Sequence, residues 1–175
     1  EPMAGFSIPA AEHSTITSWG RDREVDAYRN MLRQFSKPGS LVAVVSDSYD
    51  VYEAVKTHWG KTLRDEVVRA GGTLVVRPDS GDPVEVVLRC LELLDEAFGH
   101  DMTSKGFRVL RNVRVIQGDG ISPSTVATIL ERMTAAGYAT DNVAFGMGGG
   151  LLQRVDRDTQ KFALKCSAAR VDGAW

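Results

Sequence analysis

Val42-Ala43-Val44-Val45-Ser46-Asp47 is an apolar run that ends in a carboxylate, and a helical pattern follows it. The same arrangement returns at Leu74-Val75-Val76-Arg77-Pro78-Asp79-Ser80-Gly81 and at Val113-Arg114-Val115-Ile116-Gln117-Gly118-Asp119-Gly120. A fourth run, Val143-Ala144-Phe145-Gly146-Met147-Gly148-Gly149-Gly150, ends in glycines instead. Short β-branched runs separated by helical patterns predict buried parallel strands joined by helices.

Ligands of such folds bind at the carboxyl ends of the strands. We therefore expect Asp47, Asp79, Asp119 and the glycines of the fourth run to converge on one pocket. Carboxylates beside glycine-rich turns suit a ligand that carries hydroxyl and phosphate groups. The pattern thus predicts where a ligand binds but does not name it.

The connecting helices are marked by capping residues and glycine stops. Predicted helix starts are Asp22, Asp50, Asp82-Pro83 and Ser122-Pro123, and predicted stops are Gly71-Gly72, Gly99 and Gly137. Gly60 is expected to interrupt the second helix. Residues 100–112 are polar and predict an exposed loop, whereas the tail from Phe162 predicts a strand.

Two of these units repeat the order apolar run, Asp, Gly, capping residue, Pro and amphipathic helix. Such βα repeats occur in (β/α) barrels and in open doubly wound sheets. About four strands are too few to close an eight-stranded barrel, so either the sheet is open or further strands lie outside the sequence. We predict an α/β fold, with residues 1–175 forming one domain that is a piece of a larger one.

Composition narrows the class of protein. The 175 residues carry a formal net charge of -2, which gives no basic footprint for nucleic acid. Every apolar run is shorter than a bilayer span and no secretory leader is recognisable, so we expect a cytoplasmic protein without a membrane segment. Cys90 and Cys166 are expected to be buried free thiols rather than a disulfide or metal pair.

Arg77 and Asp79 lie on a predicted strand-to-helix turn that Pro78 and Gly81 stiffen. A guanidinium there can bind phosphate while the carboxylate accepts hydrogen bonds from ribose hydroxyls. The alternative is an internal Arg77–Asp79 ion pair with Asp82 acting only as a helix cap.

Glycines flank the other candidate contacts. Gly118-Asp119-Gly120 would let a sugar approach the main chain, although a simple tight turn is equally consistent. Gly148-Gly149-Gly150 can present amide groups to a phosphate, helped by basic residues downstream. Those residues are Arg154, Arg157, Lys161 and Lys165.

His13 follows small residues and Glu12, and it could carry protons, bind phosphate or attack phosphorus; a structural role is the alternative. Asp47 and Asp50 could add a polar rim, although capping by Asp50 explains part of that cluster. His58 and His100 are expected to be surface residues without such roles. Many carboxylates with one nearby histidine disfavour a zinc site, whereas Mg²⁺ carried by a diphosphate would fit.

Five motifs in register resemble the nicotinamide phosphoribosyltransferase family, over almost the whole chain. They are Ser7-Ile8-Pro9-Ala10-Ala11-Glu12-His13-Ser14-Thr15, Val45-Ser46-Asp47-Ser48-Tyr49-Asp50, Arg77-Pro78-Asp79-Ser80-Gly81, Ile116-Gln117-Gly118-Asp119-Gly120 and Ala144 to Gln153. Nicotinate phosphoribosyltransferases resemble the chain next best. The resemblance implies a type II phosphoribosyltransferase built on a (β/α) barrel, of which about four βα units are present here.

The resemblance also implies the chemistry: nicotinamide and 5-phosphoribosyl 1-diphosphate (PRPP) give nicotinamide mononucleotide and diphosphate. It implies that ATP phosphorylates His13, that Arg77 holds diphosphate or phosphate, and that Asp79 and Asp119 bind the ribose. Gly118, Gly149, Arg157 and Lys165 would contact the nucleotide, some of them across a homodimer with a shared active site. Mg²⁺ would arrive with PRPP.

Segments with the family's clamp on the pyridine ring have no counterpart in the sequence. We therefore expect the chain on its own to bind phosphate ligands weakly, to self-associate and not to turn over. The rival hypothesis is a noncatalytic phosphosugar-binding module or an inert truncated domain.

Overall fold

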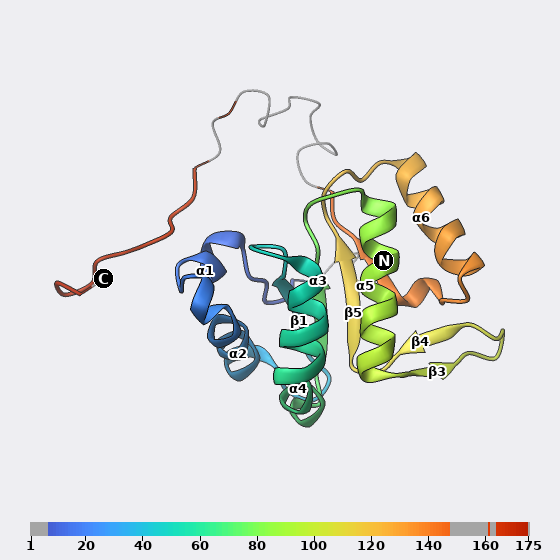
Figure 1. The fold of residues 1–175 in the computed structure, drawn as a ribbon, viewed down its shortest axis with the longest axis horizontal. Helices are drawn as coiled ribbons and strands as arrows, with labels where there is room; N and C mark the ends of the chain where they lie inside the picture. Colours follow the sequence, from blue (N-terminus) through green and yellow to red (C-terminus); the bar gives the residue numbers. More distant parts are fainter. Residues whose placement is uncertain (1–6, 148–160, 162–163, 175) are drawn as a thin grey trace, which may run out of the picture.

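The computed structural model describes residues 7–147, 161 and 164–174. Its centre is a four-stranded parallel sheet (Figure 1). The strands are β1 (Leu41–Val45), β2 (Thr73–Arg77), β5 (Val113–Gln117) and β6 (Val143–Phe145), in the order β1-β2-β5-β6. The predicted α/β class and the four parallel strands are therefore confirmed.

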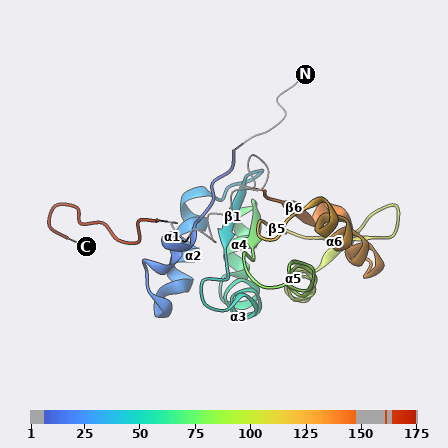
Figure 2. The same cartoon turned by 90° about the horizontal axis from the view of Figure 1, so that it is seen from above.

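Helices connect successive strands. They are α1 (His13–Thr17), α2 (Glu24–Phe35), α3 (Val51–Glu53), the π-helix η2 (Ala54–Thr62), α4 (Arg64–Ala70), α5 (Pro83–Phe98) and α6 (Pro123–Ala135), with 3₁₀ turns η1 (Arg21–Arg23) and η3 (Thr140–Asn142). Neighbouring helices touch in chain order, α2 with α4, η2 with α5, and α5 with α6. In Figure 2, α3 and α5 lie on the same side of the sheet. The helices thus form one layer against one face.

Three of the predicted caps are confirmed. Asp50 Oδ1 accepts from the backbone N–H groups of Tyr52 and Glu53, both at 3.0 Å. Asp82 does the same at the start of α5, and Ser122 Oγ caps α6. Side-chain oxygens there replace partners that the first turn of a helix lacks.

The predicted cap at Asp22 is wrong. Asp22 lies inside the 3₁₀ turn η1, and α2 begins at Glu24. The chain enters this turn at Gly20, whose φ is +82°. Because the tight turn comes first, the helix starts beyond the reach of the Asp22 side chain.

Gly60 does not interrupt the second helix as predicted, because it lies within the π-helix η2. A Cβ on Gly60 would come within 2.9 Å of the Val55 carbonyl oxygen and 3.1 Å of Ala97 Cβ on α5. Glycine therefore allows η2 and α5 to approach each other closely. A turn at Leu63 separates η2 from α4, which ends before Gly71, whose φ is +71°.

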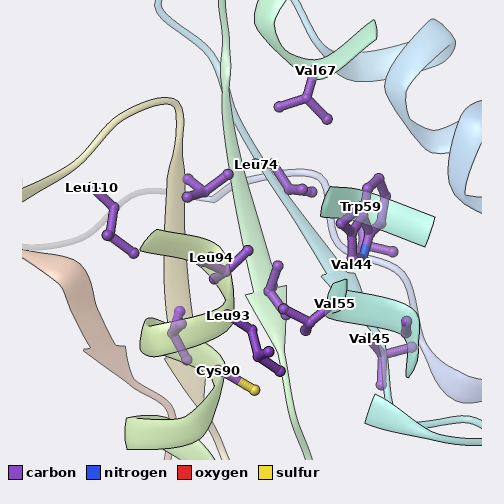
Figure 3. Close-up of a cluster of buried hydrophobic side chains, with 14 of the residues drawn as sticks. Val44, Val45, Val55, Trp59, Val67, Leu74, Cys90, Leu93, Leu94 and Leu110 are labelled. Atoms are coloured by element: carbon purple, nitrogen blue, oxygen red, sulfur yellow. The ribbon is translucent and has the colours of Figure 1, made fainter. Parts of the chain in front are cut away.

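The core lies between the sheet and the helix layer (Figure 3). Val44, Leu74, Trp59 and Leu94 are all at most 1% exposed. Cys90 of α5 is buried among them as predicted, and burial raises the pKa of its thiol to about 12. Burial of this much apolar surface is the main force holding the layers together.

Residues 100–112 form a hairpin rather than the predicted loop. Strands β3 (His100–Met102) and β4 (Arg108–Leu110) pair antiparallel and lie beside the end of α5 (Figure 1). Asp95 of α5 anchors them, with His100 Nδ1 at 2.5 Å and Arg108 Nη1 at 2.7 Å. Ion pairs to a helix, rather than apolar alternation, hold this hairpin, which is why its sequence resembled a loop.

The other two histidines are not isolated surface residues as predicted. His100 pairs with Asp95, and His58 Nε2 lies 3.3 Å from Glu24 Oε2 on α2. The Glu24 side chain is only 6% exposed. A buried carboxylate requires polar partners, which the sequence spacing did not reveal.

The predicted strand in the tail does not form within residues 164–174. These residues are exposed, and their backbone pairing is limited to an isolated bridge between Val171 and Ala174. Cys166 is exposed there, which contradicts the expected burial. Within the described ranges, no helix is long and apolar enough to cross a membrane.

Candidate functional site

Several of the predicted site residues meet at the carboxyl ends of the strands. Asp47 lies just beyond β1, Arg77 ends β2 with Asp79 in the turn that follows, and Gly118 follows β5. The segment before α1 joins them because Ala10 bridges Ala43 at the outer edge of β1. Hydrogen bonds of 2.9 Å from Ala11 N to Ala43 O and from Ala43 N to Pro9 O fix that segment.

His13 and Asp47 form a close pair. His13 Nε2 lies 2.8 Å from Asp47 Oδ1, and the side chains are 34% and 4% exposed. A buried carboxylate holds the ring in one orientation while the imidazole keeps access to solvent. The arrangement suits a histidine that exchanges a proton or a phosphoryl group.

Arg77 is the centre of a second cluster. Its Nη2 and Nε contact the two oxygens of Asp79 at 2.6 and 3.1 Å, and its Nη1 lies 3.2 Å from Glu12 Oε1. Partial burial opposes the charged form of Arg77, but the bond to Asp79 and its charge raise the Arg77 pKa overall. Arg77 is therefore a permanent cation at the strand ends.

Glu12 links the two clusters, since it precedes His13 and also accepts from Lys165 Nζ at 3.0 Å. Partial burial works against its charge, yet the hydrogen bond from Lys165 and the charge of Arg77 lower the Glu12 pKa. From the sequence, Glu12 was considered only as a neighbour of His13 and not as a site residue. Its adjacency to His13 was the signal that could have marked it as a site residue.

Gly118 gives Asp79 the room it needs. A Cβ on Gly118 would lie 3.1 Å from Asp79 Oδ1 and 3.8 Å from Arg77 Nε. The next residue, Asp119, is exposed, and its carboxylate makes no hydrogen bond or ion pair with the residues described. An acid without internal partners at a strand end can accept hydrogen bonds from a ligand.

The alternative of an internal ion pair describes part of this geometry. Arg77 and Asp79 do pair with each other, and Asp82 does cap α5. Asp50 likewise caps α3, so its contact with a ligand stays a prediction. Pro78 is buried in the turn, and Gly148, Gly149 and Arg157 lie outside the described residues.

Gln117, the last residue of β5, was not selected from the sequence. It is fully buried, and its Nε2 donates to Asp119 O at 2.9 Å. Its position among Val113 and Val115, which are also buried, was the available signal. A polar residue at a core position of a strand calls for an explanation.

A metal would need ligands beyond these clusters. No group of three or more His, Cys, Asp and Glu side chains placed to hold an ion occurs in the part of the chain that the structure describes. Mg²⁺ therefore stays a prediction, as an ion carried by a diphosphate ligand.

The family model for nicotinate phosphoribosyltransferase (NAPRTase) matches residues 1–175. The chain belongs to this family. It is 74% identical over 174 residues to the nicotinamide phosphoribosyltransferase of Xanthomonas campestris pv. campestris (strain 8004), covering 99% of this chain and 37% of that protein.

More distant relatives carry the same name. The nicotinamide phosphoribosyltransferase of Acinetobacter baylyi is 31% identical over 190 residues, covering 98% of this chain and 37% of that protein. The one from Mycoplasma pneumoniae is 29% identical over 187 residues, covering 99% and 41%. Nearly the whole chain is thus matched, and it spans about two fifths of the length of these relatives.

Proposed function

We propose that the complete protein transfers the phosphoribosyl group of PRPP to nicotinamide, giving nicotinamide mononucleotide and diphosphate in NAD biosynthesis. The observation that carries this proposal is the cluster of Arg77, Asp79 and exposed Asp119 at adjacent strand ends of a chain in this family. The names of the relatives favour nicotinamide over nicotinate.

The charges of Arg77 and Asp119 suggest a different role for each residue. Arg77 already contacts Glu12 through Nη1, at the solvent-exposed side of the pair. A diphosphate that replaces Glu12 there would find a guanidinium held in place by Asp79. Asp119 would accept the ribose hydroxyls, and the fixed cation would stabilise negative charge on the departing diphosphate, with Mg²⁺ bound to the ligand.

The contact between His13 and Asp47 supports a role for His13 as a phosphoryl acceptor. When Nε2–H donates to Asp47, the lone pair lies on Nδ1, which is then the nucleophilic nitrogen. We propose that ATP phosphorylates His13 and that the phosphorylated ring acts beside Arg77. The partly exposed ring and its nearly buried partner support this assignment.

The sheet also supports a partial barrel. Strand order follows chain order without a reversal, the Ala10–Ala43 bridge adds a further parallel segment at the edge, and the helices occupy one layer. Doubly wound sheets reverse their order and carry helices on both faces, whereas barrels do neither. We propose that the remaining strands of the complete protein close the barrel, and that two copies in the cytoplasm share their active sites.

An assay of nicotinamide mononucleotide formation tests the function. The complete protein should form product from nicotinamide and PRPP, faster with ATP, and should prefer nicotinamide to nicotinate. A noncatalytic phosphosugar-binding module would bind PRPP and form no product with or without ATP. Residues 1–175 alone should bind PRPP weakly and form no product, because the pyridine-binding segments lie outside them.

A further inference from the structure

Gln117 contacts the backbone of Asp119, the proposed sugar-binding residue. The Gln117 side chain is 0% exposed, and Nε2 donates to Asp119 O at 2.9 Å. The backbone oxygen of Gln117 accepts from Gly146 N at 2.8 Å, which ties β5 to the end of β6. Gln117 therefore lies at the base of the turn formed by Gly118-Asp119-Gly120.

The other end of the Gln117 amide is poorly satisfied. Its Oε1 is buried and finds no hydrogen-bond partner among the described residues. One neutral hydrogen bond contributes about 0.5–1.5 kcal/mol, whereas a buried unsatisfied polar atom costs about 1–3 kcal/mol. Stability alone would favour an apolar side chain of the same shape here. Val113 and Val115, which precede Gln117 on the same buried face of β5, are apolar.

The turn itself has little intrinsic stiffness, because glycines occupy two of its three positions. Thr125 Oγ1 holds one end by donating to Gly120 O at 2.9 Å. Within the described residues, Gln117 supplies the side-chain bond to the backbone of Asp119. This bond restrains the Asp119 backbone, from which the carboxylate extends.

We propose that Gln117 is a positioning residue that fixes Asp119 for the phosphoribosyl group, at a cost in stability. The proposal rests on the proposed function of the site. Small displacements of a positioned group reduce rates by about 10- to 100-fold, so loss of the Gln117 amide should reduce the rate strongly. Its effect is exerted through Asp119 and not by contact with the substrate.

The test is Gln117→Met in the complete protein, since methionine keeps the length of the side chain and removes the amide. We expect kcat/KM for PRPP to fall about 10-fold or more, with a melting temperature equal to or above that of the wild type. The matched control is Asn142→Leu, at a fully buried amide whose atoms are bonded to Leu110 N, Arg108 O and Ala139 O. That control should lose stability and keep its kcat/KM per folded molecule.

A double-mutant cycle with Asp119→Ala decides whether Gln117 acts through Asp119. In the Asp119→Ala background, Gln117→Met should cause no further loss of kcat/KM, even if the methionine variant is also less stable. Additive losses, or an unchanged kcat/KM in the single variant, would overturn the proposal. If the wild type forms no product, the proposed function fails, and PRPP affinity measured by calorimetry then decides: an unchanged affinity in Gln117→Met overturns the positioning role.

Discussion

The two ends of the sheet differ in how completely their polar side chains are paired inside the fold. At the amino end, Asp95 contacts His100, Arg108 and the Tyr138 hydroxyl, at 2.5, 2.7 and 3.3 Å. Asn142 is fully buried there and makes three hydrogen bonds. Each of these polar groups has a partner inside the fold.

The carboxyl end also has paired groups, such as Arg77 with Asp79, but it leaves two buried polar atoms of the described residues unsatisfied. Ser48 Oγ and Gln117 Oε1 are the buried side-chain atoms without a hydrogen-bond partner among the described residues, and both lie beside carboxyl ends of strands. Asp119 is exposed without a partner in the same part of the chain. Because unsatisfied polar groups cost free energy, the contrast supports the proposal that the carboxyl end binds a ligand, whereas the amino end stabilises the fold.

The strongest test of this contrast is Asp119→Ala in the complete protein. We expect kcat/KM to fall about 100- to 1,000-fold, because the carboxylate proposed to bind the reacting sugar is lost. The free energy of unfolding should change by less than about 0.5 kcal/mol, since the side chain is exposed. Product formation and urea unfolding measure the two quantities; unchanged turnover would remove Asp119 from the site.

Asn142→Leu makes the opposite prediction at the amino end. Its loss leaves Leu110 N, Arg108 O and Ala139 O without their side-chain partners. We expect the free energy of unfolding to fall by about 3 kcal/mol, from several bonds and unsatisfied groups of 1–3 kcal/mol each. Thermal unfolding measures this, and a large fall in kcat/KM of the folded fraction would contradict the division between the two ends.

His13→Ala tests the His13–Asp47 pair at the carboxyl end. The variant should lose both phosphorylation by ATP and the stimulation of turnover by ATP, while a slow ATP-independent reaction remains because Arg77, Asp79 and Asp119 are unchanged. Intact-mass measurement after incubation with ATP, together with initial rates, reports the result. Phosphorylation of the variant to the wild-type level would place the modification on another residue.

The same division explains how much the sequence could predict. Apolar periodicity placed the four parallel strands, and local chemistry placed the caps at Asp50, Asp82 and Ser122, because both are governed by residues close in sequence. Likewise, Asp47 and Arg77 were expected at the strand ends from the βα pattern alone. Their pairing with His13 and Glu12 depends on the Ala10–Ala43 bridge, for which the sequence has no local signal.

Ion pairs between different elements account for the errors at the hairpin and at the two histidines. The hairpin at residues 100–112 is held by Asp95, and His58 is paired with Glu24 more than thirty residues away. Neither pairing follows a helical or strand period, so residues that look like loop or surface were misjudged. Gln117 was overlooked for a related reason. Its side chain donates to the backbone oxygen of Asp119, and such a bond leaves no recognisable motif in the sequence.

The smallest expected effect concerns Glu12, an acid at the carboxyl end whose pKa is lowered by neighbouring residues of the site. Burial opposes the shift, but Lys165 and Arg77 lower the pKa below the ordinary 4.5. A carboxyl with a lower pKa in the folded state stabilises the fold above the unfolded pKa, and this contribution is lost as pH falls through the folded value. Glu12→Gln should therefore destabilise the protein slightly at pH 7, and the difference from wild type should shrink below about pH 4.5.

Urea unfolding at pH 7 and at pH 3.5 measures that difference. Glu53→Gln is the matched control, because Glu53 is an exposed acid that makes no ion pair with the described residues. In Glu12→Gln, Arg77 keeps its ion pair with Asp79. If the stability of the wild type relative to this variant instead grows on acidification, the charged form of Glu12 is repelled by its surroundings. In that case Glu12 would belong with the unsatisfied groups kept for a ligand and not with the ion pairs that hold the strand ends together.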